Sequence, residues 1–241
     1  MHIQNGVLDP VTLVVTGTAA VGAVTYAGVQ LRKGEKRWGL AAASAGAVLV
    51  AHLLDVPLGM GGTLTAHVIG GTLLAVALGP WLGLLTMTGV LAFEALVLGD
   101  GGRAALGANV LIMAVAGVLV GWAVYRAVLL AVARWRGEPP GDRWIVLAAG
   151  VAAWVSVAAS SLVLWGVYAM GAPSQLAARA WSVSIPHHLA WAVLEAAATA
   201  AIVAVGLAWA GHRARALAHA DTMGVGHRHV PVIDGDLEAL G

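Results

Sequence analysis

Long apolar stretches separated by short polar segments dominate the chain. A helix that crosses a bilayer needs about 20 mostly apolar residues. The pattern predicts seven helices, over Val11–Leu31, Trp38–Leu54, His67–Leu78, Trp81–Leu98, Leu106–Ala133, Trp144–Met170 and Pro186–Ala210. The third is short for a crossing because a Gly-Pro pair ends it. The pattern therefore predicts an all-α, polytopic transmembrane bundle of about seven helices.

The chain divides by polarity into a transmembrane domain over residues 1–210 and a polar tail over residues 211–241. The tail is rich in histidine and arginine, and it is expected to be disordered and solvated, as chain ends usually are. An alternative role for its histidines is to buffer metal in the cytoplasm. These histidines are His212, His219, His227 and His229.

Composition supports the membrane assignment and excludes several other classes. Sixty per cent of the residues are hydrophobic and only 10% are charged, whereas a soluble domain carries about 25% charged residues. The net charge of +1 and the near absence of lysine exclude a nucleic-acid-binding surface. There is no cysteine, which excludes disulfides and thiolate metal sites. No cleavable signal peptide is visible, because no basic region precedes the first apolar stretch.

The distribution of lysine and arginine predicts the orientation in the membrane. Cytoplasmic loops carry an excess of these residues. The segments "RKGEKR" and "RWRGEPPGDR" are strongly basic, whereas the alternate loops hold little beyond Arg103 and Arg179. Seven helices then place the N-terminus outside the cell and the C-terminus in the cytoplasm. The histidines and carboxylates that precede the tail gather at the outer end.

The first two residues form a candidate chelate for a metal ion. The Met1 amine, the His2 amide nitrogen and His2 Nδ1 can close a five-membered and a six-membered ring around one ion. Three such nitrogens leave one corner of a square for a fourth ligand, and square-planar nitrogen sites are typical of Ni(II) or Cu(II), with Co(II) a further possibility. His67, in "GTLTAHVIGG", is the best candidate for the fourth ligand, because ionisable residues at membrane depth are usually functional. The alternative is that His2 has no role in a frayed terminus.

Four stretches carry a family resemblance. They are "MHIQNGVL", "AHVIGGTLLAVALGPWLGLL", "LGDGGRAALGANVLIMAVAG" and "PHHLAWAVLEAAATAAIV". In this order they resemble the CbiM/NikM-type substrate-binding (S) components of energy-coupling-factor (ECF) transporters for cobalt and nickel. The resemblance implies a metal site formed by Met1, His2 and His67, with Ni(II) or Co(II) as transported substrate and no catalytic cofactor. It does not choose between the two ions, although the square-planar argument favours nickel.

The resemblance also implies partners and supporting residues. A membrane coupling (T) subunit and two ATPase (A) subunits would complete the transporter in a prokaryotic plasma membrane, and some relatives need an additional small membrane subunit. Asn109 is expected to support the ligands. Apart from the resemblance, Asp100 in "GDGG" is expected to shape a turn and is a further supporting candidate, and His187 and His188 either form an entrance for a cation or lie at the membrane interface. Asn5 departs from the acidic residue common in the family, which would weaken its support of the terminus.

A second function comes from the internal histidines. His52, Asp55, His67 and His187 or His188 could supply ligands to an intramembrane zinc hydrolase, in which zinc activates a water. The chain has no H-E-x-x-H motif. It also lacks the phosphate-binding loop G-x-x-x-x-G-K-[ST]. If the chain is part of an ATP-driven transporter, other subunits must hydrolyse the ATP.

Overall fold

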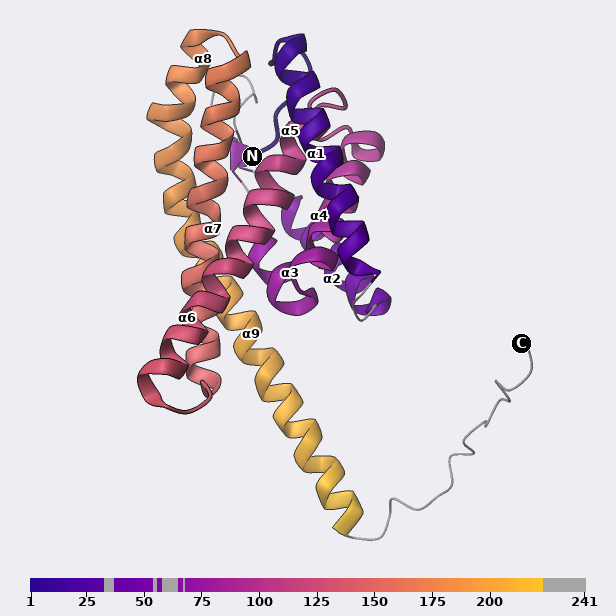
Figure 1. The fold of residues 1–241 in the computed structure, drawn as a ribbon, viewed down its shortest axis with the longest axis vertical. Coiled ribbons are helices and arrows are strands. Elements are labelled where there is room, and N and C mark those ends of the chain that lie inside the picture. The colour runs from indigo at the N-terminus through magenta and orange to yellow at the C-terminus, as the bar shows by residue number, and fades with distance from the viewer. Residues whose placement is uncertain (33–36, 54–55, 58–64, 67, 223–241) are drawn as a thin grey trace, which may run out of the picture. The chain divides into compact units, whose positions relative to one another are not determined.

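The computed structural model of the chain describes residues 1–32, 37–53, 56–57, 65–66 and 68–222, and it describes side chains outside residues 54–67 up to residue 212. The predicted polytopic helical bundle is confirmed (Figure 1). The described residues contain seven helical segments. They are α1 (Pro10–Leu31), α2 (Trp38–His52), α3 (Gly71–Leu78), α4 with η2 (Pro80–Phe93, Glu94–Leu98), α5 with η3 and α6 (Leu106–Asn109, Val110–Val120, Gly121–Arg136), α7 (Asp142–Gly171), and α8 with η4 and α9 (Ser174–Arg179, Ala180–Ser184, Ile185–Thr222). Two short antiparallel strands, β1 (Val56–Pro57) and β2 (Thr65–Ala66), lie between α2 and α3.

Five of the helical segments are long and apolar enough to cross a membrane. They are Pro10–Leu31, Pro80–Leu98, Leu106–Arg136, Asp142–Gly171 and Ser174–His212. Helix α2 is apolar but shorter. Large apolar side chains such as Val14, Leu162 and Val193 are exposed on these helices. Exposed apolar surface of this kind suits lipid tails, and the chain is therefore a multi-pass membrane protein.

The chain divides into two compact units, Met1–Val203 and Ala204–Gly241. All contacts discussed below lie in the first unit. Helix α9 remains helical to Thr222, past the start of the expected tail. The domain boundary at residue 210 stays a prediction.

The continuous helix from α5 to α6 is the centre of the first unit. It packs against α1, α3, α4 and α7. Two of these contacts bring main chain against main chain: a Cβ on Gly107 would lie 2.5 Å from Gly17 Cα, and a Cβ on Gly71 would lie 2.7 Å from the Gly117 carbonyl carbon. Glycine at such crossings lets helices approach closely in lipid. The high glycine content is therefore used partly for helix packing.

Helix α1 begins where the sequence predicts, because Asp9 and Pro10 form a helix start. Asp9 Oδ1 accepts a hydrogen bond from Thr12 N at 2.9 Å, which satisfies a main-chain donor of the first turn. This bond holds the pKa of the Asp9 carboxyl below its usual value. The Asp9 N–H donates to Gly171 O at 2.8 Å. The N-terminal segment is thus attached to the end of α7 before α1 begins.

The third helix begins later than the sequence predicts. The prediction starts it at His67, whereas α3 starts at Gly71. Gly70 has φ of 72°, a left-handed conformation that does not continue a right-handed helix. A Cβ at Gly70 would also lie only 2.9 Å from Val48 Cγ2. The apolar pattern across "HVIGG" therefore conceals a turn before the helix.

The last helix begins earlier than the sequence predicts. The prediction starts it at Pro186, but Ser174–Thr222 is helical without interruption. The π-helical segment η4 precedes Pro186, and its wider turn carries the bond from Ile185 N to Ala180 O. A wide turn relieves the clash between a proline ring and the carbonyl four residues earlier. Proline is thereby accommodated inside the helix.

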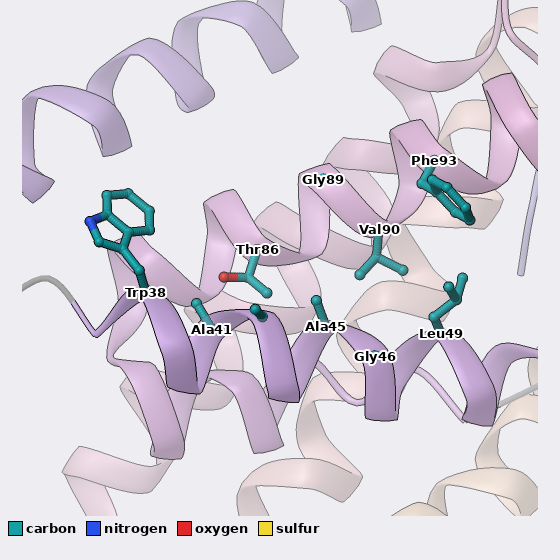
Figure 2. A pocket seen from close by; sticks show the side chains of 10 residues that line it. Trp38, Ala41, Ala45, Gly46, Leu49, Thr86, Gly89, Val90 and Phe93 are labelled. Atoms are coloured by element: carbon teal, nitrogen blue, oxygen red, sulfur yellow. The ribbon is translucent and has the colours of Figure 1, made fainter.

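A groove with a volume of about 360 Å³ lies between α2 and α4 (Figure 2). Small residues form much of its wall, among them Ala41, Ala45, Gly46 and Gly89, and Trp38 and Phe93 also line it. Added side-chain volume at Gly89 would meet no atom within 4 Å. Helices α2 and α4 are therefore not tightly packed along the whole of this face.

Candidate metal centre

The N-terminal residues are buried inside the first unit, close to α5 in Figure 1. Met1 is 2% exposed and Ile3 is fully buried. Ile3 N donates to Asn109 Oδ1 at 2.8 Å, and Asn109 Nδ2 donates back to Ile3 O at 3.2 Å. A side-chain amide that pairs with main chain in both directions replaces a partner strand. Asn109 therefore fixes the terminus at Ile3, directly after the two expected ligand residues, Met1 and His2.

The loop 99–105 holds the other side of the same segment. Gly102 N donates to Ile3 O at 2.8 Å, and Ala104 N donates to Asn5 Oδ1 at 3.0 Å. A Cβ on Gly102 would lie 2.5 Å from Asn5 N and 2.7 Å from the Gln4 carbonyl carbon. Only glycine lets these two stretches of main chain touch. The contact of Gly102 with Gln4 and Asn5 therefore fixes the N-terminal segment against the loop 99–105.

The His2 imidazole lies between two carboxylates. His2 Nδ1 is 3.1 Å from Asp100 Oδ1, and His2 Nε2 is 3.4 Å from Glu94 Oε2. His2 is 5% exposed and Glu94 is 1% exposed. Glu94 Oε2 makes no hydrogen bond among the described residues. Burying a carboxylate oxygen without a hydrogen bond costs free energy, so the site favours a positive charge or an N–H donor near Glu94 Oε2.

The carboxylates control the protonation of His2. Burial lowers the pKa of His2, and the Met1 amine also lowers it, but Asp100 and Glu94 more than offset both, so the pKa is raised above its usual value. The hydrogen bond from His2 in turn lowers the pKa of the Asp100 carboxyl. The raised pKa means that protons compete more strongly with a metal for His2 than for an ordinary imidazole.

His52, at the end of α2, links Glu94 to the start of α3. His52 Nδ1 is 2.8 Å from Glu94 Oε1, and His52 Nε2 is 3.1 Å from Ile69 O. A carbonyl oxygen only accepts, so His52 Nε2 is the donor in the bond to Ile69 O. The His2 and His52 rings meet edge to face, with centroids 5.9 Å apart. Glu94 thus has one oxygen at each histidine.

The wider turn of η2 accompanies this placement of Glu94. Glu94 begins the π-helical segment η2, and its carbonyl oxygen accepts hydrogen bonds from both Gly99 N and Asp100 N. Segments of π-helix are frequent at functional sites, because they change the direction of a side chain within a helix. Another π-helical segment, η3, begins directly after Asn109.

His2, His52 and Glu94 are a possible metal-binding group. One ligand atom from each residue lies within 4.8 Å of the others. Imidazole nitrogen suits Ni(II), Cu(II), Zn(II) and Fe(II). The donors present therefore suit a first-row transition metal rather than Mg²⁺ or Ca²⁺, which prefer oxygen ligands alone.

The other predicted site residues have different outcomes. His67 and Asp55 lie outside the described residues, as do His227 and His229. His187 is exposed, and its Nδ1 donates to Val183 O at 2.7 Å. His188 is buried, and its Nδ1 lies 2.7 Å from Ser184 O and 3.0 Å from Ser184 Oγ. In these described contacts both histidines bond to the turn before them.

The sequence reasoning did not connect three ionisable residues with the site. The sequence gives His52 a place only in the alternative zinc hydrolase, and it gives Glu94 and Glu195 no partner. Arg103 donates to the main-chain oxygens of Ala95 and Leu96, at 3.4 and 3.5 Å. Glu195 accepts from the main chain at Ile69 and Gly70. The available signal was an ionisable residue inside an apolar segment, which carries a large burial cost and is usually functional.

Comparisons with known proteins agree with this architecture. A relative from Rhodobacter capsulatus, the fused nickel transport protein NikMN, is 37% identical over 167 residues, which cover 67% of this chain and 45% of the relative. A relative from Lactiplantibacillus plantarum, named "Probable fused nickel transport protein LarMN", is 42% identical over 130 residues, which cover 52% of this chain and 39% of the relative. The chain spans less than half the length of these two curated relatives.

Two solved structures share the fold. A crystal structure of a truncated transition metal transporter superposes with a TM-score of 0.75 at 30% identity, over 86% of this chain and 98% of that one. A second transition metal transporter gives a TM-score of 0.72 at 29% identity, over 84% and 91% of the two chains.

The family assignment rests on most of the chain. Residues 2–210 match the family model described as "Cobalt uptake substrate-specific transmembrane region". This family consists of transport components rather than enzymes, so the intramembrane zinc hydrolase is not favoured. The helical bundle, the buried terminus and the match over residues 2–210 lead to one assignment, that this chain belongs to the CbiM family of transmembrane metal-uptake components.

Proposed function

We propose that the chain is the substrate-specific membrane component of an ECF-type transporter, and that it captures Ni(II) or Co(II) outside the cell for ATP-driven uptake. The observation that carries this proposal is the buried N-terminus, in which His2 lies between Asp100 and Glu94 while Asn109 holds the main chain at Ile3. A chain terminus ordinarily frays. Such extensive anchoring supports a role for the terminal residues themselves.

In this proposal the ion is held by the Met1 amine, the His2 amide nitrogen, His2 Nδ1 and His67. The position of Glu94 suits a supporting role, because a metal-bound imidazole usually donates its other N–H to a carboxylate. Glu94 Oε2, 3.4 Å from His2 Nε2, is the acceptor available for that proton. Asp100 Oδ1 lies 3.1 Å from His2 Nδ1 and accepts a hydrogen bond from it while the site is empty; in this proposal the metal replaces that contact.

The transport cycle requires partners. ATP hydrolysis is supplied by two ATPase subunits, and a membrane coupling subunit transmits it to this chain, with an additional small membrane subunit in some transporters. The assembly lies in the prokaryotic plasma membrane. The names of the relatives support nickel as one substrate, and the planar nitrogen chelate favours nickel over cobalt.

Metal binding by the purified chain with its native Met1 tests the proposal. We expect calorimetry to show tight binding of Ni(II) and Co(II). His2→Ala removes imidazole and should weaken binding by more than about 100-fold, because loss of a supporting residue alone costs about 10–100-fold. Glu138→Gln, in an exposed loop, is the control and should bind as the unmodified chain does.

Two results would contradict the proposal. If the unmodified chain binds neither ion, metal capture is wrong. If His2→Ala binds as tightly as the unmodified chain, capture takes place elsewhere in the protein. Uptake of radioactive nickel by cells, with and without the ATPase subunits, then tests the coupling to ATP: accumulation that is independent of those subunits would contradict an ECF-type mechanism.

The proposed orientation can be measured because the chain has no cysteine. Ser174, at the start of α8, and Glu138, after α6, are exposed and belong to loops predicted on opposite sides of the membrane. In intact cells a membrane-impermeant maleimide should label Ser174→Cys, and it should label Glu138→Cys only after permeabilisation. The unmodified chain gives the background. The reverse pattern would place the metal site on the cytoplasmic side.

A further inference from the structure

Glu195 is a buried carboxylate in α9 that the metal site described above does not use. Its side chain is 2% exposed. Oε2 accepts a hydrogen bond from Ile69 N and Oε1 accepts one from Gly70 N, both at 2.8 Å. Glu195 lies 126 residues after Ile69 and 125 residues after Gly70 in the chain. A buried carboxylate is costly unless both oxygens are bonded, so this contact is a specific one.

The two amides belong to the turn at the start of α3. Gly70 is the N-cap residue of α3, it has φ of 72°, and as a glycine it has no side chain with which to cap the helix. A negative charge near the start of a helix is stabilised by the helix dipole. Glu195 therefore fixes the conformation of Ile69 and Gly70 from a different helix.

A continuous series of contacts leads from this turn to His2. Ile69 O accepts the hydrogen bond from His52 Nε2 at 3.1 Å. His52 Nδ1 is 2.8 Å from Glu94 Oε1, and Glu94 Oε2 is 3.4 Å from His2 Nε2. If the turn moved, His52 would lose its carbonyl acceptor, and Glu94 would be free to change its position against His2.

We infer that Glu195 is a positioning residue for metal capture, which clamps the main chain at Ile69 and Gly70 and thereby holds His52 and Glu94 in place at His2. The inference rests on the proposed function. It makes α9 part of the binding machinery, although Glu195 does not contact the ion. Ligand geometry depends on such supporting contacts, which typically change metal affinity by about 10–100-fold.

Glu195→Gln tests the inference with little change of volume. The amide keeps one acceptor oxygen but presents an N–H₂ group to a main-chain N–H, so one clamp bond is lost. We expect about 10–100-fold weaker Ni(II) binding in calorimetry. Amide hydrogen exchange at Ile69 and Gly70 should be faster in the metal-free protein. Thr199→Val, buried one turn further along the same face of α9, is the matched control and should change neither measurement.

A double-mutant cycle separates positioning from a general loss of structure. Residues in one network give non-additive effects, whereas independent residues add. Once Glu195→Gln has released the turn, His52→Gln should reduce Ni(II) affinity less than it does in the unmodified chain. Additive losses would overturn the inference. If Glu195→Gln does not fold, Glu195→Asp takes its place, because its carboxylate is withdrawn by one methylene and should weaken binding in the same way.

The outcomes distinguish this inference from the proposed function. If the unmodified chain binds neither Ni(II) nor Co(II), the proposed function fails and the inference fails with it. If the unmodified chain binds and Glu195→Gln binds equally well, the inference alone is overturned. Weaker binding, faster exchange at the clamp and non-additivity with His52 together support it.

Discussion

Addition of Gly-Ser ahead of Met1 is expected to abolish tight Ni(II) and Co(II) binding. The extension converts the Met1 amine into an amide, so the proposed chelate loses its terminal nitrogen donor. It also adds two residues to a terminus that is already buried, with Met1 2% exposed. Since the loss of supporting residues alone costs about 10–100-fold in affinity, loss of a ligand should exceed that range. Calorimetry on the two proteins measures the difference.

The fold of the extended protein must be checked separately. The hydrogen bonds of Ile3 with Asn109 and Gly102 lie two residues inside the chain and can persist. A similar melting temperature for the extended and unextended proteins would show that the bundle is intact. A Gly-Ser extension at the C-terminus is the matched control and should leave binding unchanged. Equal binding by all three proteins would remove Met1 from the ligand set and favour the group formed by His2, His52 and Glu94.

The sequence predicts the helical bundle well because lipid imposes a simple rule. Every main-chain group within the membrane must be bonded internally, so an apolar stretch of sufficient length forms a helix. The predicted starts of the first and second helices, at Val11 and Trp38, agree with α1 and α2 within one residue. The same rule fails where the apolar pattern continues through a turn. Gly70 interrupts an apolar stretch by its left-handed conformation, which hydropathy does not register.

The candidate site was only partly predictable, because its contacts join distant parts of the chain. Local chelate chemistry identifies His2 as a candidate ligand, and the family resemblance identifies Asn109 as a supporting residue. Asp100 is noted for its place in the "GDGG" turn. The pairing of His52 with Glu94 spans 42 residues, and the contact from Glu195 to Ile69 spans 126. Burial cost indicates that such residues need partners. Only the packing of α2, α4 and α9 in space identifies which partners they have.

Gly102 is a single position at which the sequence does not reveal a long-range contact. Turn propensity alone explains the glycines of "GDGG". In the structure a Cβ at Gly102 would lie 2.5 Å from Asn5 N and 2.7 Å from the Gln4 carbonyl carbon. Both are main-chain atoms, so one stretch of chain has to move. We therefore expect Gly102→Ala to displace the N-terminal segment and to weaken Ni(II) binding by about tenfold or more, as loss of other support for a metal site does.

Gly89→Ala is the control for this substitution, since an added Cβ there meets no atom within 4 Å. It should leave both Ni(II) affinity and the melting temperature close to those of the unmodified chain. Gly102→Ala should retain the bundle, because Gly102 lies in a loop outside the helices that form the core. A large fall in affinity with a small change in melting temperature would mean that the loop acts on the terminus. Native affinity in Gly102→Ala would show that metal capture does not depend on where the terminus is held, and the buried chelate would then be the wrong site.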